Sequence, residues 1–254
     1  MSKYLVVFVR HGESEWTHKN LFCGWIDSGL TDKGREDAKQ AGVALNSENL
    51  KFDVAYTSIL QRACDSLDII LREIKQPELP VIQAWELNER HYGALTGYNK
   101  AEMAAKYGNE QVQIWRRSFD ILPPQMEKDH SYYNEIHNNK KFMPIRDKIP
   151  QAESLKTTML RVIPFWNSTI LPDIKDGKRV LVVCHGTSLR GIVKHIDRIS
   201  DEAIVKVNLP TGIPFIFEFD ADFNPVVSMK FLSSGDTLKE AIARAASIGE
   251  AGTK

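Results

Sequence analysis

The sequence contains little cysteine and carries no net charge. Its three cysteines, Cys23, Cys64 and Cys184, have the spacing of neither a disulfide framework nor a zinc site. We therefore expect reduced thiols and a cytoplasmic protein. Lysine plus arginine equals aspartate plus glutamate at 33 each, which argues against a nucleic-acid partner because such proteins usually carry a basic excess. Any anion site must come from local clustering of basic side chains.

Long apolar runs are also missing. No stretch approaches the ~18 residues of a membrane helix, and the apolar run at the N-terminus ends at Arg10 and His11, unlike a signal peptide. We therefore expect no membrane partner. The aspartate, glutamate and histidine residues show no grouping typical of metal ligands, so we expect no metal. The 254 residues, 43% of them hydrophobic, suffice to bury a full core.

Segments typical of strands alternate with segments typical of helices. The predicted strands are residues 4–9, 54–58, 81–84 and 179–184, followed by an edge hairpin of residues 215–220 and 226–231. The predicted helices are residues 31–45, 61–73, 100–107, 110–119, 154–171 (kinked at Pro164), 189–195, 201–207 and 236–247. This order predicts an α/β fold, a three-layer sandwich with a mostly parallel central sheet and helices on both faces. We expect a single domain over residues 1–254, with an insertion at about 86–150 forming part of the active-site wall and a mobile tail from about 248.

Two His-Gly pairs, His11-Gly12 and His185-Gly186, each follow a predicted buried strand. Ligands of open α/β sheets bind beyond the carboxyl ends of parallel strands, so both pairs should meet in one crevice. A neutral imidazole is a nucleophile, and a reference pKa of about 6.5 leaves it mostly neutral near pH 7. With Arg10 beside His11, the pattern favours phosphoryl transfer, which needs an in-line nucleophile and positive charge on the equatorial oxygens. The alternative interpretation is two polar strand ends with turn glycines.

The irregular stretch after residue 86 contributes further candidates. Glu89 is either a proton shuttle for a hydroxyl that gains or loses phosphate, or an exposed loop carboxylate. Basic side chains that suit phosphate or carboxylate lie near the candidate loops: Arg10, Arg62, Lys100, Arg116 and Arg117. Each one alone is more often a solvated surface charge, whereas five together indicate a small polyanionic substrate. Arg190 fits a site or a surface equally well.

The residues around these candidates resemble one family. RHGESEW at residues 10–16 is similar to the phosphohistidine signature of the histidine phosphatase superfamily. Further segments resemble its cofactor-dependent phosphoglycerate mutases: residues 20–25 (NLFCGW), 87–93 (LNERHYG), 115–119 (WRRSF), 153–155 (ESL), 188–195 (SLRGIVKH) and 208–214 (NLPTGIP). The resemblance runs in register over about residues 3–245. It implies a phosphoglycerate mutase-like fold and an isomerase of glycolysis and gluconeogenesis.

The resemblance also implies a mechanism and a set of residue roles. His11 becomes a phosphohistidine, primed by 2,3-bisphosphoglycerate, and interconverts 3-phosphoglycerate and 2-phosphoglycerate. Glu89 moves the proton, and His185 stabilises the transferring phosphoryl group. The implied substrate-binding residues are Arg10, Ser14, Thr17, Asn20, Cys23, Gly24, Arg62, Arg90, His91, Tyr92, Lys100, Arg116, Arg117, Gly186 and Thr187. The family further implies chemistry without a metal, small phosphorylated glycerates as partners, and a homodimer.

Two positions depart from the family pattern. Thr17 and Thr187 stand where the family has asparagines that lie on the phosphate. A hydroxyl replaces an amide that donates two hydrogens, and a lost hydrogen bond to a charged group costs about 1.5–3 kcal/mol, or roughly ten- to a hundred-fold each in rate or affinity. We therefore expect a slow or specialised mutase. There are two alternatives. In one, bisphosphoglycerate synthase or phosphatase activity predominates over mutase activity; in the other, the protein is a catalytically weak regulatory paralogue. Gly24 favours the mutase, because the family's specialised synthases have serine in this region.

Overall fold

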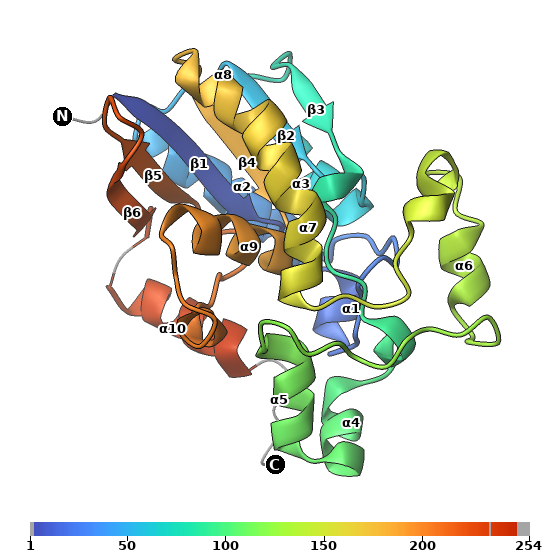
Figure 1. Ribbon diagram of the computed structural model, residues 1–254. Coiled ribbons are helices and arrows are strands. Elements are labelled where there is room, and N and C mark those ends of the chain that lie inside the picture. The colour runs from blue at the N-terminus through green and yellow to red at the C-terminus, as the bar shows by residue number, and fades with distance from the viewer. Residues whose placement is uncertain (1–2, 234, 248–254) are drawn as a thin grey trace.

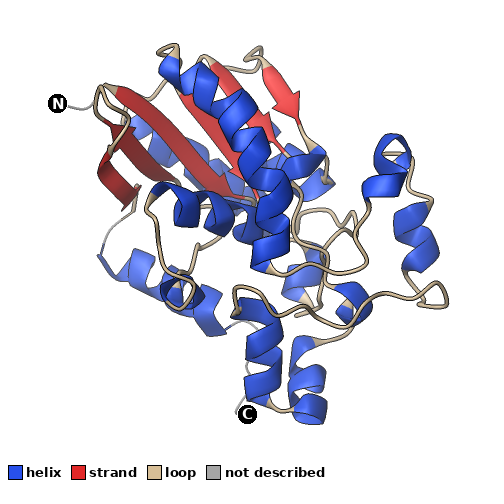
Figure 2. Cartoon of the chain, in the orientation of Figure 1, coloured by secondary structure: helices blue, strands red, loops and turns tan. Residues whose placement is uncertain are grey.

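In the described part of the protein, six strands form one sheet at the centre of the fold. The computed structural model describes residues 3–233 and 235–247. The strands are β1 (Tyr4–Arg10), β2 (Val54–Thr57), β3 (Val81–Gln83), β4 (Val180–Cys184), β5 (Phe215–Phe219) and β6 (Pro225–Phe231). Their order in the sheet is β3-β2-β4-β1-β5-β6, and β1 to β4 pair in parallel while β5 runs antiparallel to both of its neighbours. The predicted mostly parallel sheet with an edge hairpin is confirmed (Figure 2).

Helices surround this sheet and extend beyond its carboxyl edge (Figure 1). They are α1 (Glu15–His18), α2 (Asp32–Ser47), α3 (Gln61–Glu73), α4 (Lys100–Tyr107), α5 (Asn109–Arg117), α6 (Tyr133–His137), α7 (Leu155–Phe165), α8 (Leu171–Lys175), α9 (Gly186–Ile196) and α10 (Gly235–Ser247). Short 3₁₀ turns are η1 (Trp85–Leu87), η2 (Gly93–Leu95), η3 (Met143–Lys148) and η5 (Ala203–Lys206), and η4 (Trp166–Ile170) is a π-helix. Among the described residues, none of these helices is both long and apolar enough to cross a membrane.

Alternating side chains of the central strands build the two halves of the core. Val6 and Phe8 of β1 point into a cluster with residues of α7, η4, α8 and α9. Val7 and Val9 point the other way, into a cluster with residues of α2 and α3. Because successive strand residues face opposite sides, a strand of continuous apolar residues must be covered on both faces. This packing is the physical basis of the predicted three-layer sandwich.

Several element predictions need correction. No helix was predicted between residues 119 and 154, but the insertion contains α6 and η3 there. The short helix α1 after β1 was not predicted either. The predicted helix at 201–207 is only the 3₁₀ turn η5. The predicted helix at 189–195 begins earlier, at Gly186, because His185 has the extended backbone of an N-cap residue. The chain therefore turns from β4 directly into α9, which brings residues 186–190 to the end of the strand.

Pro164 lies inside a helix that the structure continues rather than ends. Proline lacks the amide hydrogen that would bond to the Leu160 carbonyl, so a regular α-helical ladder cannot pass through it. The chain responds with the wider π-turn of η4 directly after α7, and then resumes as α8 up to Lys175. The predicted end of this helix at residue 171 is therefore too early.

Candidate active site

His11 and His185 meet at the carboxyl end of the sheet. They follow β1 and β4, which are parallel neighbours with Arg10 paired to Cys184. The His11 amide donates to the Cys184 carbonyl at 3.0 Å, so the pairing extends one residue further. The two imidazole centroids lie 4.9 Å apart, edge to face. Two His-Gly pairs far apart in sequence thus occupy one place in the fold.

The surroundings of His11 leave one ring nitrogen available. Its Nδ1 lies 2.7 Å from the Gly12 carbonyl oxygen. Because a carbonyl only accepts, Nδ1 carries the hydrogen and Nε2 keeps its lone pair. Burial, followed by the charges of Arg62 and Arg10, holds the pKa of His11 well below its usual value. His11 is therefore a neutral imidazole with Nε2 free to act as a nucleophile.

Glycine is required at position 12 by close packing of the backbone. A Cβ on Gly12 would overlap the carbonyl group of Gly34 near the start of α2. The Gly12 amide also donates to Ser66 Oγ on α3 at 3.1 Å. The loop after β1 is thereby held against α2 and α3. These contacts fix the position of the Gly12 carbonyl, which orients the His11 ring.

His185 is buried beside His11 and is also neutral. Its Nε2 lies 2.7 Å from Ser58 Oγ, and its Nδ1 has no hydrogen-bond partner among the described residues. Burial, followed by the charge of Arg62, lowers the pKa of His185 well below its usual value. A bound anion would offset the desolvation of His185 and so raise its pKa. The anion would also supply an acceptor for a hydrogen on the ring.

Basic side chains line the cavity in front of His11. They are Arg10, Arg62, Lys100, Arg116, Arg117 and Arg190. Within the described part of the chain none of these six forms an ion pair with a carboxylate. Several bind main-chain carbonyls instead, such as Arg62 with Ile26 and Gly24, both at 2.8 Å. The cavity therefore concentrates positive charge that the rest of the protein does not neutralise.

This crowding shows in the pKa values of the basic groups. Burial, followed by the neighbouring charge of Arg116, lowers the pKa of Lys100 to about 7. Burial, followed by Arg117, lowers the pKa of Arg190 to about 9. The Nε atoms of Arg10 and Arg190 are buried without a hydrogen-bond partner among the described residues. Such unsatisfied donors are costly, and an anion in the cavity would satisfy them.

Glu89 is the only carboxylate among the described residues that line this cavity. Its Oε1 accepts from the Arg90 amide at 2.8 Å, and its Oε2 accepts from the Thr187 amide at 3.4 Å. The Thr187 amide belongs to the first turn of α9, directly after His185. The carboxylate is thus held beside the histidine pair, where it can exchange a proton with a bound hydroxyl.

Other predicted binding residues also line the cavity: Thr17, Cys23, Gly24, Tyr92, Gly186 and Thr187. The Thr17 hydroxyl is bonded to Ser14 Oγ at 2.9 Å. Gly24 has φ +55°, and a Cβ there would lie 3.1 Å from the Arg90 carbonyl oxygen. Glycine therefore lets the chain turn closely along this wall.

Four predicted binding residues are not among the residues that line the cavity. Ser14 is the buried N-cap of α1, and the Asn20 carbonyl accepts from the Lys100 amide at 2.9 Å. Arg90 lies behind the wall, where it stacks on the Tyr92 ring at 4.5 Å and donates to the Trp115 carbonyl. His91 is fully buried, and its amide donates to Glu153. These four contribute to the loops that carry the lining residues.

Arg190 and the C-terminal helix contribute to the cavity beyond the predicted set. Arg190 is buried and lines the cavity, which decides between the two interpretations left open by the sequence. If the predicted helix had begun at Gly186 and not at residue 189, it would have placed residues 186, 187 and 190 on one face. Arg190 would then have been predicted as a cavity residue. Ala245 of α10 also lines the cavity, and its carbonyl accepts from Arg117 Nη2 at 3.0 Å. The predicted tail from residue 248 lies outside the described residues.

The profile of the histidine phosphatase superfamily, branch 1, matches residues 6–136 and 125–231. The chain belongs to this superfamily. The matched stretches carry both histidines, Glu89 and all six cavity cations, so the superfamily profile covers the whole site except for the contact with α10.

Solved structures of similar fold come from several organisms. A phosphoglycerate mutase from Bacillus anthracis is 22% identical, with a TM-score of 0.65 over 96% of this chain and 98% of that one. The alpha-ribazole phosphatase from Shigella flexneri is 19% identical, with a TM-score of 0.65 over 91% and 98%. A mycobacterial glucosyl-3-phosphoglycerate phosphatase in complex with VO3 is 19% identical, with a TM-score of 0.65 over 90% and 96%. At such identities the likeness shows a common fold, while the reaction has to be argued from the site.

Proposed function

We propose that this member of the histidine phosphatase superfamily is a 2,3-bisphosphoglycerate-dependent phosphoglycerate mutase. It interconverts 3-phosphoglycerate and 2-phosphoglycerate through a phosphohistidine on His11. The observation that carries the proposal is a neutral His11, with Nε2 free, in a cavity whose six cations form no ion pair with a carboxylate of the described residues. A nucleophile and uncompensated positive charge are what phosphoryl transfer needs.

The cavity fits a bisphosphorylated glycerate in charge. Each phosphate carries about −1.5 to −2 charge at pH 7, and the ligand has a carboxylate as well. In the described part of the chain, six cations and one glutamate line the cavity, and the Nε atoms of Arg10 and Arg190 are buried donors without a hydrogen-bond partner. When bound, the bisphosphate supplies the phosphoryl group that loads His11. A single phosphate would leave much of this charge unmatched.

His11 and Glu89 divide the chemistry between them. In the phosphoenzyme, the free hydroxyl oxygen of the bound monophosphoglycerate attacks the phosphorus on His11, and the N–P bond breaks. The Glu89 carboxylate takes the proton of that hydroxyl. His11 Nε2 then attacks the other phosphate of the bisphosphorylated glycerate. The O–P bond breaks, and Glu89 returns its proton to the leaving oxygen. Phosphorylated His11 and the Glu89 carboxylate are both restored, so the net reaction is an isomerisation.

The remaining lining residues divide according to their place in the cavity. Around the histidine pair, Arg10, Arg62, Gly186 and Thr187 hold the transferring group, and His185 stabilises its developing charge. The residues of the opposite wall hold the far end of the substrate: Cys23, Gly24, Tyr92, Lys100, Arg116 and Arg117. These residues of the opposite wall, which we call the far wall, accept the second anionic group of the substrate. A simple phosphatase does not require such a group.

Net phosphatase activity is a second candidate, favoured by one observation at Thr187. This residue lines the cavity next to His185, and its hydroxyl has no hydrogen-bond partner among the described residues. A hydroxyl in place of a longer amide leaves more room for water beside the phosphohistidine. Water attack would release phosphate rather than form a bisphosphate. The partition between the two acceptors decides whether mutase or phosphatase activity dominates.

Intact-mass analysis and product partition test the proposal together. The purified chain is incubated with 2,3-bisphosphoglycerate, and we expect one acid-labile phosphoryl group that is absent from the His11→Ala variant. With 3-phosphoglycerate as substrate, 2-phosphoglycerate should form faster than inorganic phosphate. An adduct that survives His11→Ala would contradict the nucleophile, and faster release of inorganic phosphate would identify the chain as a phosphatase.

We also propose that the protein is cytoplasmic and forms a homodimer. β3 is an edge of the sheet, and Val81 and Ile82 on it are exposed at 42% and 38%. An exposed edge strand with apolar side chains is a template for pairing with another chain. Light scattering coupled to size-exclusion chromatography measures the mass, and a monomer at micromolar concentration would contradict the dimer.

A further inference from the structure

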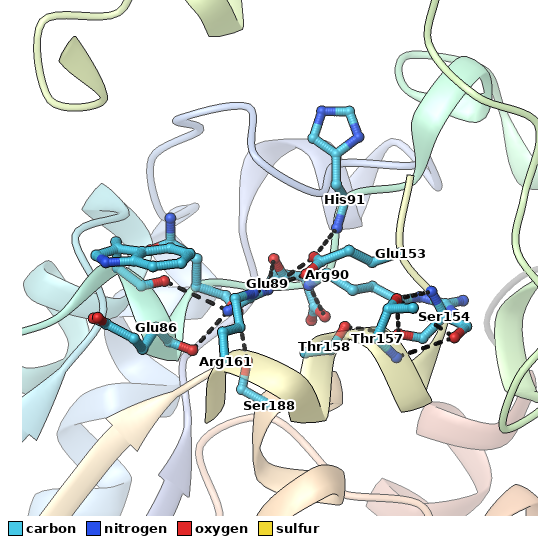
Figure 3. A network of polar contacts seen from close by, with 12 residues as sticks. Glu86, Glu89, Arg90, His91, Glu153, Ser154, Thr157, Thr158, Arg161 and Ser188 are labelled. Carbon is cyan, nitrogen blue, oxygen red and sulfur yellow. Dashed lines mark hydrogen bonds and ion pairs between the residues drawn. The ribbon is translucent and has the colours of Figure 1, made fainter. Parts of the chain in front are cut away.

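A buried ion pair lies directly behind the loop that carries Glu89 (Figure 3). Arg161 of α7 and Glu153, just before that helix, have side chains only 8% and 4% exposed. The Arg161 Nε donates to Glu153 Oε1 at 2.8 Å, and its Nη2 donates to Oε2 at 2.9 Å. The two groups thus form a bidentate pair of fixed relative orientation. Neither residue lines the cavity.

The same guanidinium also binds the Glu89 loop. Its Nη1 donates to the carbonyls of Trp85, Glu86 and Asn88, at 3.4, 2.6 and 2.9 Å. Its Nη2 donates to the carbonyl of Glu89 itself at 3.0 Å. All five N–H hydrogens of Arg161 are therefore engaged. One side chain joins α7 to four main-chain carbonyls of the segment that ends at the proposed proton shuttle.

The partner carboxylate holds the other side of Glu89. Glu153 Oε2 accepts from the His91 amide at 2.8 Å, and the Glu153 amide donates to the His91 carbonyl at 2.8 Å. Ser188 of α9 adds a hydrogen bond from its hydroxyl to the Asn88 carbonyl. Backbone groups on both sides of Glu89 are therefore held by Arg161 of α7, by Glu153 just before α7 and by Ser188 of α9.

A buried ion pair is not in itself evidence of a gain in stability, since its desolvation cost can exceed the attraction between its charges. Its effect here is geometric, because the planar guanidinium meets six acceptors at once. We propose that the Arg161–Glu153 pair is a positioning element that sets the Glu89 carboxylate for proton transfer. This inference rests on the proposed function, in which Glu89 is the acid and base. A shift of about 1 Å at a catalytic group costs about 10²-fold in rate.

The proposal predicts a defect that depends on the leaving group. Phosphorylation of His11 by 2,3-bisphosphoglycerate expels an alkoxide, which needs the proton from Glu89. Phosphorylation by acetyl phosphate expels a carboxylate, which leaves without a proton at pH 7. A misplaced Glu89 therefore slows the first reaction and spares the second, whereas general damage to the cavity slows both.

Arg161→Lys tests this prediction because it keeps the charge but has only three hydrogens on a single nitrogen. The single-turnover rate of His11 phosphorylation is measured with each donor. We expect a loss on the order of 10²-fold with 2,3-bisphosphoglycerate and less than about threefold with acetyl phosphate. Glu153→Gln should show the same selectivity. Arg72→Lys, at an exposed ion pair with Asp68 on α3, is the matched control and should change neither rate.

The ratio of the two rates does not depend on the fraction of folded enzyme, so partial misfolding does not obscure the result. Equal losses with both donors, or no loss with either, would overturn the positioning role of Arg161. Glu89→Gln serves as the reference and should show the selective loss in its largest form. If Glu89→Gln shows no selectivity, or wild-type chain takes phosphate from neither donor, the proposed function fails and the positioning role fails with it.

Discussion

Replacing Lys100 with methionine should stabilise the fold and weaken substrate binding. The Lys100 ammonium is buried in the cavity and donates to the Leu21 carbonyl at 2.6 Å. Burial, followed by the charge of Arg116, lowers its pKa from 10.5 to about 7. A depressed lysine pKa means that the folded state pays for keeping this group charged. An anion bound in the cavity would offset this cost.

The magnitude follows from the pKa shift. At about 1.4 kcal/mol per pKa unit, the charged Lys100 costs the fold at most roughly 4–5 kcal/mol. Methionine removes this cost but leaves the Leu21 carbonyl without its donor, at about 1–3 kcal/mol. We therefore expect Lys100→Met to raise the free energy of unfolding by about 2 kcal/mol at pH 6. The lost charge–phosphate or charge–carboxylate contact should weaken substrate binding about ten- to a hundred-fold.

The pH dependence gives the sign of the effect independently. Between the folded pKa of about 7 and the unfolded value of 10.5, the unfolded chain binds one more proton at Lys100 than the folded chain. The wild-type free energy of unfolding therefore rises with pH from this group, by about 1.4 kcal/mol per unit. The advantage of Lys100→Met should be full at pH 6 and fall by about 2–3 kcal/mol between pH 7 and pH 9.

Urea unfolding of both proteins at pH 6, 7, 8 and 9 measures this difference, and calorimetric titration with 3-phosphoglycerate measures the affinity. Lys106→Met, an exposed lysine on the same helix, is the control and should show no pH-dependent difference. If Lys100→Met is less stable than wild type at pH 6, or its difference from wild type does not change with pH, the charged cavity is not under the electrostatic strain described here.

Three further predictions concern Thr187, Gly24 and the expected chemistry without a metal. Thr187→Asn should raise the mutase rate about tenfold by adding an amide donor to the phosphate; an unchanged or lower rate in a coupled enolase assay would reject this interpretation. Gly24→Ser should lower the free energy of unfolding by about 1–2 kcal/mol, since φ is +55° there, and a wild-type unfolding midpoint would contradict it. Dialysis against EDTA should leave activity unchanged; a loss that added Mg²⁺ or Zn²⁺ restores would contradict chemistry without a metal.

The sheet and its histidines were predictable because local patterns decided them. The apolar runs before His11 and His185 are buried on both faces, which forces parallel strands with helices on each side. Parallel neighbours then bring their carboxyl ends together, so the meeting of the two rings follows from the topology. The carboxyl-end rule required no knowledge of the side-chain contacts.

The basic lining of the cavity was less predictable, because tertiary contacts decide it. Arg62 and Lys100 are buried by carbonyls of remote loops, whereas a lone basic residue is usually solvated. Arg117 Nη2 donates to the Ala245 carbonyl of α10, 128 residues further along the chain, and no local sequence pattern encodes such a contact. Arg161 likewise has an ordinary helical context, and its function as an anchor of the Glu89 loop is visible only in space.

The most direct test of the account is the position of phosphate on the His11 ring. Because Nδ1 donates to the Gly12 carbonyl, only Nε2 can attack phosphorus. Phosphorus NMR of the chain loaded with 2,3-bisphosphoglycerate, read against synthetic phosphohistidine isomers, distinguishes the two nitrogens. The account predicts one phosphoramidate on Nε2 that disappears in His11→Ala. A signal from Nδ1, or from any residue that persists in this variant, would contradict it.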